Sequence, residues 1–384
     1  MLYLPKPSDP KFVIQNKNNQ YYINYNQVNT HNKLNNYNSL NRNYSPEFSS
    51  QELFESFIIP QPTFLAAAHS AALEILPNGN LIATWFAGSH EGKPDVKIWQ
   101  SIFDGRKWEL AHPIITPAKI AHDTDQYIRK VGNPLVYRSI DNHLHLFVVS
   151  VGLGGWSGSS LTQFISKDLG KTWGVGHKLI LSPFLNISTL IRTKAITLAD
   201  GGFYLPVYHE FMRTYPELLR FDKTGKFISQ TRLNSHNSLV QPAILPITPN
   251  YAYAFMRNHT RNDNPLYYQT TNDGGVSWTK LASTNLSNQD TSLAVEMVES
   301  SQYLMVHNMG GRDKLSLAVS NDGINWRDIY LLENTPHEEF SYPAIQIHAG
   351  IVDILYTWKR SNIKHVEFNL SWLNQHSGYS RCKT

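Results

Sequence analysis

Four stretches of the chain repeat one order of residues, and this repeat constrains the fold more than any other feature. The order is a hydroxyl residue, Asp, Gly, a second hydroxyl residue and Trp. It is complete at 166–173 and 271–278, shortened at 320–326 and blurred at 101–108. In such a stretch Asp and Ser or Thr side chains bond nearby backbone N–H groups, glycine takes a positive φ, and Trp packs beneath the turn. The repeat therefore predicts four equivalent hairpin turns.

The spacing of these turns predicts the number of units in the fold. Their tryptophans stand at 108, 173, 278 and 326, which suits a unit of about 50 residues, with one unit after position 173 lacking the full pattern. Residues 221–226 fall in that gap and keep the Asp and Gly without the Trp. A repeat of this length, made of short strands, predicts an all-β fold, a six-bladed β-propeller with these turns.

The remaining sequence favours strands over helices. Apolar runs are separated by turns rich in Gly, Asn and Asp, and sustained helical periodicity is absent. The runs that we predict as strands are 81–88, 145–150, 203–208, 251–256, 303–307 and 351–358. A Gly-rich stretch at 152–158 is either a loop over the central face of the propeller or a plain connector.

Composition divides the chain into two parts. Residues 1–50 are rich in Asn and Tyr and have poor apolar periodicity, which predicts a flexible or loosely docked N-terminal arm. We expect residues 51–384 to form the propeller. No apolar run of about 20 residues and no basic-then-apolar leader is present. We therefore expect a soluble protein, either cytoplasmic or, with a leader missing from this chain, periplasmic or membrane-peripheral.

Charge and metal-binding residues narrow the function classes. The formal net charge is only +4, without long basic runs, so a nucleic-acid partner is not expected and an anionic substrate is weakly favoured. The single cysteine, Cys382, excludes an intramolecular disulfide and a cysteine metal site. His143 and His145 lie two residues apart, but no third ligand is evident nearby, so ordinary strand histidines are favoured. We expect no metal and no cofactor.

The four turns resemble the Asp-box of the sialidase superfamily, S/T-x-D-x-G-x-S/T-W. The resemblance covers most of residues 55–370 and implies the propeller fold. In that family the boxes are structural and lie away from the catalytic face. The resemblance further implies an exo-glycosidase that acts on a terminal sugar acid. Such a site needs a clamp for the substrate carboxylate, a proton donor and a nucleophile.

Guanidinium groups suit the clamp because their planar fork binds a carboxylate in a bidentate way and stays charged. Most arginines only solubilise a surface, but the resemblance assigns Arg257 and Arg312 as the second and third of the family's three clamp arginines. The place of the first is taken by 65–70, where His69 stands instead. Arg192 is a further candidate for positive charge near the substrate. These residues are our predicted substrate-binding set, together with Gln241.

The family's nucleophile is a tyrosine at a strand start downstream of the third arginine, and Tyr342 matches that place. A tyrosine suits this chemistry because a carboxylate would be repelled by the carboxylate on the anomeric carbon, and sialidases are the tyrosine exception among glycosidases. The alternative is that Tyr342 is an aromatic core residue.

Two acid–base roles remain. For the general acid, the loop at 88–95 offers Glu91, with Asp95 as the substitute; burial would keep such a carboxyl group protonated. An exposed acidic loop without function is the alternative. The glutamate that polarises the tyrosine in the family is replaced by Gln241, which cannot act as a base, so Glu210 is the candidate for that role. The Glu91 and His69 substitutions resemble a divergent branch of bacterial sialidase-like proteins.

We therefore predict hydrolysis of the ketosidic bond of a terminal 2-keto-3-deoxy sugar acid, either sialic acid or the Kdo of lipopolysaccharide. Some bacterial sialidase-like proteins that remove Kdo work with a membrane-protein partner. The resemblance therefore implies a possible membrane-protein partner for this chain. The alternative is a non-catalytic propeller that binds acidic glycans or a protein. It would keep the arginines and the Asp-boxes without needing Tyr342, Glu91 or a base.

Overall fold

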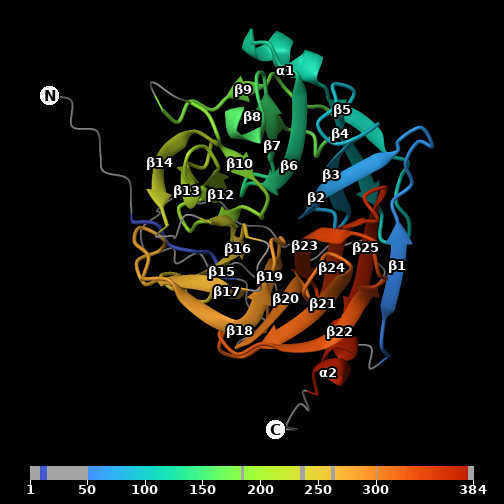
Figure 1. Cartoon of the computed structure of the whole chain (residues 1–384), viewed down its shortest axis with the longest axis vertical. Coiled ribbons are helices and arrows are strands. Elements are labelled where there is room, and N and C mark those ends of the chain that lie inside the picture. Colours follow the sequence, from blue (N-terminus) through green and yellow to red (C-terminus); the bar gives the residue numbers. More distant parts are fainter. Residues whose placement is uncertain are drawn as a thin grey trace, which may run out of the picture.

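A computed structural model describes residues 9–14, 51–182, 186–233, 238–260, 264–299 and 301–378. Within these residues six antiparallel sheets surround a central axis, as Figure 1 shows, and the predicted six-bladed propeller is confirmed. Cys382 and most of the N-terminal arm lie outside the described residues. None of the helices in the described part of the chain is long and apolar enough to cross a membrane.

Each blade is formed by consecutive strands, numbered from the axis outward. The first blade contains β2 (Ala67–Ile75), β3 (Leu81–Gly88), β4 (Lys97–Phe103) and β5 (His112–Ile115). The second contains β6 (Lys130–Arg138), β7 (Leu144–Val151), β8 (Ser159–Ser166) and β9 (His177–Lys178). The third contains β10 (Leu190–Ile191), β11 (Ile196–Thr197), β12 (Phe203–His209), β13 (Tyr215–Phe221) and β14 (Phe227–Arg232).

The other three blades follow the same order. The fourth contains β15 (Leu239–Pro246), β16 (Ala252–Asn258), β17 (Asn264–Thr271) and β18 (Ala282–Asn288). The fifth contains β19 (Ala294–Glu299), β20 (Gln302–Asn308), β21 (Lys314–Ser320) and β22 (Arg327–Asn334). The sixth contains β23 (Phe340–His348), β24 (Ile351–Trp358) and β25 (Asn362–Asn369).

The ring of blades is closed by pairing of the first strand of the propeller with the last. β1 (Phe54–Ile58) pairs antiparallel with β25 and becomes the outer strand of the sixth blade, with Phe54 opposite Phe368. Figure 1 shows the blue β1 beside the red β25. Since the first and last strands of the domain share one sheet, the sixth blade cannot be completed without the N-terminal strand.

All four predicted turns connect the third and fourth strands of a blade, so they are equivalent and lie on one face. In the turn at 271–278, Asp273 Oδ1 accepts the N–H of Ser277 at 2.9 Å, and Thr271 Oγ1 accepts the N–H of Gly275 at 3.0 Å. Gly275 has φ +92, as the pattern predicted. The turn at 221–226 occupies the same place in the third blade, where Asp222 accepts two backbone N–H groups without a tryptophan below.

The six predicted strands are the second strands of the six blades, β3, β7, β12, β16, β20 and β24. They are buried on both faces because neighbouring sheets cover them, which gives the continuous apolar runs in the sequence. The core lies between sheets. In the third blade Phe203 stacks on Phe221 at 4.8 Å between ring centroids, and Phe147 of the second blade contacts Phe221 at 5.4 Å.

The innermost strands begin with a β-bulge in four blades. The pairing register shifts there, and the residue at the bulge has positive φ at Ser70, Asn133, Gln241 and Tyr342. In the third blade the inner strand is interrupted between β10 and β11, and Arg192 lies in the interruption. Bulges re-aim side chains at strand ends and are frequent beside active sites. They lie at the face opposite the Asp-box turns.

Two short elements pack outside the blades. Helix α1 (Pro117–Thr124) joins the first and second blades; Thr116 caps it by accepting the N–H of Lys119, and Asp125 ends it with φ 51. Helix α2 (Leu370–Ser377) follows β25. These helices cover blade edges and leave the central face open.

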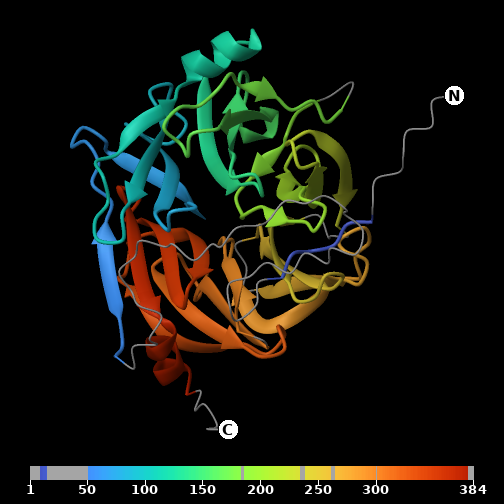
Figure 2. The ribbon, with the colours of Figure 1, turned by 180° about the vertical axis from the view of Figure 1, so that it is seen from behind.

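Residues 9–14 of the N-terminal arm are docked on the propeller. Phe12 is 1% exposed, forms a β-bridge with Leu198 and donates its N–H to the Pro249 carbonyl at 2.8 Å. Val13 donates to the Thr197 carbonyl at 3.1 Å. Figure 2 shows this blue segment in front of the strands. The described part of the arm is therefore held by the third and fourth blades on the Asp-box face.

Candidate active site

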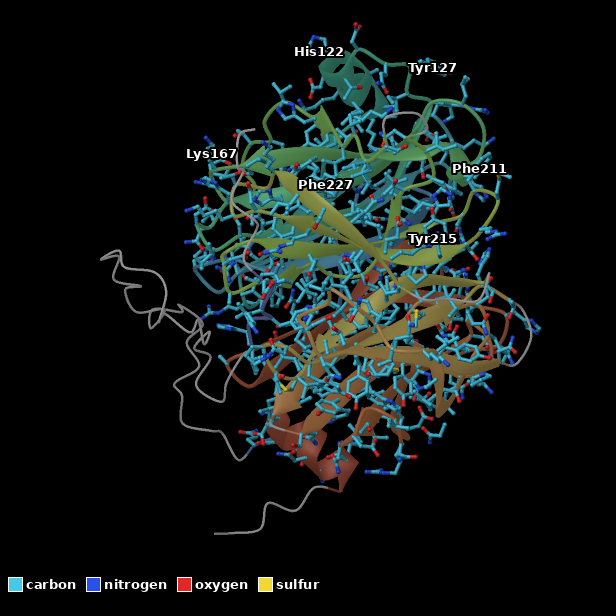
Figure 3. The ribbon with its side chains drawn as sticks, turned by 90° about the vertical axis from the view of Figure 1, so that its left-hand side faces the viewer. His122, Tyr127, Lys167, Phe211, Tyr215 and Phe227 are labelled. Atoms are coloured by element: carbon cyan, nitrogen blue, oxygen red, sulfur yellow. The ribbon has the colours of Figure 1, made fainter. Side chains whose placement is uncertain are left out.

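The candidate site lies on the face where the inner strands begin and the second strands end. Tyr342 stands at the start of β23 and Arg257 near the end of β16, while Arg312 lies in the connection from β20 to β21. Figure 3 shows the propeller edge-on, with Tyr127 and Phe211 of this face on one side and Lys167 of an Asp-box turn on the other. We call this face the site face.

Tyr342 is surrounded by positive charge. Its hydroxyl accepts a hydrogen bond from Arg257 Nη1 at 3.1 Å, and the guanidinium carbons of Arg192 and Arg312 lie 5.2 and 5.7 Å from its ring centroid. Burial alone would raise the pKa of Tyr342, but Arg257 and Arg312 favour the phenolate, and the pKa is lowered. Tyr342 also has φ 55, a left-handed conformation that costs a non-glycine residue about 1–3 kcal/mol. Such strain gathers at functional sites.

Asp290 orients Arg257, and sequence reasoning missed it. One carboxylate oxygen of Asp290 accepts from Arg257 Nε at 2.9 Å and from Nη2 at 2.6 Å, and His259 Nδ1 lies 2.9 Å from the same oxygen. Burial acts against the charge of Asp290, but His259 and Arg257 outweigh it, so the pKa of Asp290 is lowered. Arg257 is thereby held with Nη1 on Tyr342.

Glu339 links two more arginines. Its Oε1 accepts from Arg312 Nη1 at 3.0 Å and from Ser341 Oγ at 2.7 Å, and its Oε2 accepts from Arg360 Nη1 at 3.0 Å. Burial opposes its charge, yet Ser341 and the arginines lower the pKa of Glu339 to about 2. A carboxylate that is charged at neutral pH therefore holds Arg312 and Arg360 in place. Its place three residues before Tyr342 was a usable signal.

Arg360 is the third arginine of the site, and no sequence motif marked it. It lies in the turn from β24 to β25, and its backbone carbonyl accepts the N–H of Ala68 at 2.9 Å. Its guanidinium bridges Glu339 and Glu91, with which it forms an ion pair. Arg312 and Arg360 thus share the carboxylate of Glu339, while Arg257 bonds Tyr342.

His69 packs against Tyr342, the candidate nucleophile. Its ring contacts the ring of Tyr342 at 4.4 Å between centroids and is 4% exposed. Burial, with Arg360 nearby, lowers the pKa of His69 well below its usual value. The ring is therefore neutral near pH 7 and contributes shape, not charge, where the sequence comparison expected an arginine.

Arg192 supports Tyr342 from below. Its Nη1 donates to the Ala71 carbonyl at 3.1 Å and its Nη2 to the Pro343 carbonyl at 2.8 Å, so one side chain of the third blade joins the first and the sixth. Burial lowers the pKa of Arg192 to about 10, which leaves it charged at neutral pH. Arg192 is only 3% exposed, so it acts on the site through its contact with the ring of Tyr342.

Gln241 and Glu210 lie beside Tyr208. Gln241 has φ 51, and its Nε2 donates to the Tyr208 hydroxyl at 3.2 Å. The backbone N–H of Glu210 donates to Ser188 Oγ at 2.7 Å. Burial raises the pKa of Glu210, and burial followed by the charge of Glu210 raises that of Tyr208. These groups form the wall of the site on the third and fourth blades.

The two acid candidates lie in different surroundings. Glu91 is in the site, ion-paired with Arg360. Asp95 instead accepts the N–H of Ser89 at 2.7 Å and its hydroxyl at 2.9 Å, bonds that lower the pKa of Asp95 and organise the loop between β3 and β4. Of the two candidates, Glu91 is therefore the one that contacts Arg360, whereas Asp95 is engaged within its own loop.

One group among the described residues has metal-ligand spacing: Asp353, His365 and Glu367, all buried. Trp108 Nε1 donates to His365 Nδ1 at 3.2 Å, so the neutral ring carries its proton on Nε2, which lies 3.0 Å from Asp353 Oδ1. Both ring nitrogens of His365 are thus hydrogen-bonded, and the group connects an Asp-box tryptophan of the first blade to the sixth blade.

The two histidines at 143 and 145 have separate partners. His143 pairs with Asp141 at 3.0 Å and His145 with Gln163 at 3.0 Å.

A cavity of about 530 Å³ opens beside the arginines. Its walls carry both signs of charge, and the lining residues are Arg312, Asp313, His337, Glu338, Glu339, Lys359 and Arg360. A polar, charged cavity of this size accommodates a hydrophilic ligand next to the guanidinium groups.

Comparisons with known proteins agree with this architecture. The profile of a family described as BNR repeat-like domain matches residues 79–354, well over half of the chain. No curated protein is significantly similar to the chain.

Several solved structures share the fold. Hadza microbial sialidase Hz136 is 19% identical with a TM-score of 0.67; the alignment covers 79% of this chain and 66% of the sialidase, slightly less than two thirds of its length. A protein of unknown function from Dyadobacter fermentans is 13% identical, with a TM-score of 0.68 and coverage of 83% and 98%. A Trypanosoma rangeli sialidase in complex with 2,3-difluorosialic acid, described as a covalent intermediate, is 14% identical, with a TM-score of 0.61 and coverage of 84% and 60%.

Proposed function

Because the chain belongs to the BNR repeat-like family and to the sialidase-like superfamily of propellers, we propose that it is an exo-glycosidase for a terminal 2-keto-3-deoxy sugar acid. The observation that carries this proposal is the hydrogen bond from Arg257 to the Tyr342 hydroxyl, with Arg312 5.7 Å from the Tyr342 ring and Arg360 joined to Arg312 through Glu339. Guanidinium groups both bind a carboxylate and stabilise a phenolate, and this site needs both.

The proposed reaction proceeds in two steps. Arg257, Arg312 and Arg360 bind the substrate carboxylate and place the anomeric carbon against Tyr342 Oη. Tyr342 Oη forms a bond to that carbon while the bond to the leaving oxygen breaks and Glu91 gives this oxygen its proton. Water then attacks the same carbon, the bond to Oη breaks, and Glu91 takes the proton from the water. Before attack, Tyr342 loses its proton to solvent, favoured by the same positive charge, and Glu91 takes up a proton from solvent once it has left Arg360.

Glu91 must leave Arg360 before it can act as an acid. A carboxylate bonded to a guanidinium accepts hydrogen bonds and does not donate a proton. An arriving substrate carboxylate offers Arg360 an alternative partner, so binding of the substrate releases Glu91 from its ion pair. Under this proposal the acid becomes available only when the clamp is filled.

The second candidate is a non-catalytic module that binds acidic glycans. The observation that favours it is Gln241, which stands where the related enzymes carry a glutamate and which bonds Tyr208 rather than Tyr342. The two candidates share the arginines and differ only in the use of Tyr342 and Glu91.

The test offers activated sialosides and activated Kdo ketosides in parallel, followed by a ring-fluorinated analogue of whichever sugar acid is cleaved. We expect cleavage of one series and a covalent adduct on Tyr342 that mass spectrometry of peptides locates. Binding of a sugar acid without cleavage of either series would establish the binding module instead. An adduct on another residue would retain the hydrolase and discard Tyr342 as nucleophile.

A further inference from the structure

Four large apolar side chains project from the site face on the second and third blades. Their exposed fractions are 68% for Tyr127, 80% for Leu153, 40% for Phe211 and 86% for Met212. We call these four residues the apolar rim. Single exposed apolar residues are common on soluble proteins, whereas several on one face mark an interaction surface.

The topology places the apolar rim on the same face as the candidate active site. Tyr127 precedes the inner strand β6, Leu153 follows the second strand β7, and the loop that carries Phe211 and Met212 follows the second strand β12. All these connections open on the site face, and Figure 3 shows Tyr127 and Phe211 on that side. A Cβ added at Gly152 would lie 2.6 Å from the Tyr127 carbonyl, so the two connections of the second blade touch.

Local hydrogen bonds order the loop that carries Phe211 and Met212. The N–H of Arg213 donates to the Phe211 carbonyl at 2.7 Å, and His209 Nε2 lies 3.0 Å from the same oxygen. Met212, between them, has φ 61, an uncommon conformation for a residue with a side chain. The loop is therefore built to present Phe211 and Met212 outward rather than to bury them.

Positive charge accompanies the apolar rim. Arg129 and Arg213 are exposed in the same connections, and Lys130 lies 4.2 Å over the ring of the half-buried Trp156. The exposed acid in these connections is Asp125, while burial raises the pKa of Glu210 and so disfavours its charge. The apolar rim is thus accompanied by cations and by amphipathic aromatic rings. This combination suits the boundary of an anionic bilayer, where apolar groups enter the acyl region and cations meet the headgroups.

We propose that the apolar rim docks the site face on an anionic lipid surface. We favour a lipid surface over a protein partner because the side chains of the apolar rim come from separate loops. A fluid bilayer can accommodate each of them without a complementary shape. In this position the mouth of the site faces the bilayer, so its sugar-acid substrate is one carried by a lipid. This last step rests on the proposed hydrolase, but the docking does not.

The experiment sediments the full-length protein with vesicles of phosphatidylcholine containing about 30% phosphatidylglycerol at about 0.1 M salt. We expect the protein to pellet with these vesicles and about tenfold less with pure phosphatidylcholine. The double variant Leu153→Asp/Met212→Asp should lose binding by at least about tenfold, because two charges would have to enter the apolar boundary. Arg129→Ala/Arg213→Ala should weaken binding and flatten its dependence on salt.

The matched control is Val276→Asp, a half-exposed apolar residue in an Asp-box turn on the opposite face, which should pellet as the parent does. Equal unfolding midpoints ensure that the variants are folded. Failure of the parent to pellet with anionic vesicles, or equal binding by Leu153→Asp/Met212→Asp, would overturn the proposal. Self-association that the double variant abolishes, without vesicle binding, would assign the rim to a protein contact instead. Cleavage of a small water-soluble substrate should not change in the rim variants, so loss of the hydrolase activity and loss of docking are read separately.

Discussion

At the scale of single residues, Glu91 pairs with Arg360, so under the proposed function it competes with the carboxylate of the substrate. Glu91→Gln keeps the shape of the side chain and removes its charge, so we expect an unreactive sugar acid to bind more tightly, by about 3- to 10-fold. Arg360→Ala should weaken the same binding, because the clamp loses a guanidinium. Isothermal titration calorimetry measures both dissociation constants without any turnover.

The control for this pair is Asp95→Asn in the same loop, since Asp95 bonds Ser89 and should leave the affinity unchanged. If Glu91→Gln binds the acid no better than the parent, Glu91 does not occupy the clamp in the free protein. In turnover, Glu91→Gln should most impair substrates with poor leaving groups, which need a proton most.

A second effect at this scale is the dependence of stability on pH that Glu339 introduces. Its pKa falls from an ordinary 4.5 to about 2 on folding. A depressed pKa contributes stability that is complete above about pH 4.5 and is lost as the pH falls toward 2. Glu339→Gln should therefore lower the free energy of unfolding at pH 7, with the difference from the parent shrinking below pH 4. Urea unfolding at pH 7, 5 and 3 measures it, and a difference that does not depend on pH would contradict this origin.

A motif or a strand end marked Arg257, Arg312 and Tyr342 in the sequence, and the structure brings these candidates together. Sequence reasoning did not mark Arg360 and Asp290, since their contacts in the site depend on distances across blades and turns. The sequence placed His69 where the resemblance has an arginine, and burial in the assembled ring lowers the pKa of this histidine. Only the closed propeller brings these groups together.

At the scale of elements, the Asp-box turns should stabilise the blades in proportion to their hydrogen bonds. Asp273 accepts the N–H groups of Val276 and Ser277 and the hydroxyls of Thr271 and Ser277. Asp273→Ala should lower the free energy of unfolding by about 1–3 kcal/mol, the range for losing bonds to a charged group. Asp104 of the blurred turn accepts only two N–H groups, so Asp104→Ala should cost less. Equal losses in urea unfolding would contradict this ranking.

The elements also show where sequence patterns end. The turns and the second strands were predictable because each repeats a local signal, a motif or a buried apolar run. Apart from the strand start at Tyr342, the inner strands were not predicted, since bulges such as that at Gln241 break their alternation, and β10 and β11 contain only two residues each. The bulges that hide these strands from the sequence also set the positive φ of Tyr342.

At the scale of the whole molecule, ring closure by β1 connects stability to the site. β1 completes the blade that carries Tyr342, Glu339 and Arg360, and the turn of Arg360 also bonds Ala68 of the first blade. Removal of residues 1–58 should therefore lower the unfolding midpoint and weaken sugar-acid binding together, because the sixth blade loses its outer strand and its hold on the first. Calorimetric unfolding and titration measure the two effects on one sample.

The matched comparison is Phe12→Ala, which removes a buried side chain on the opposite face of the same ring. It should cost about 3–5 kcal/mol of unfolding free energy through the cavity it leaves between the third and fourth blades. Since Phe12 contacts the turns at Leu198 and Pro249 and none of the arginines, the affinity for a sugar acid should stay within about twofold of the parent. The two changes thus separate stability in general from closure in particular. If both variants lose affinity equally, the site depends on the whole ring being stable, and β1 has no special part in holding Arg360 in place.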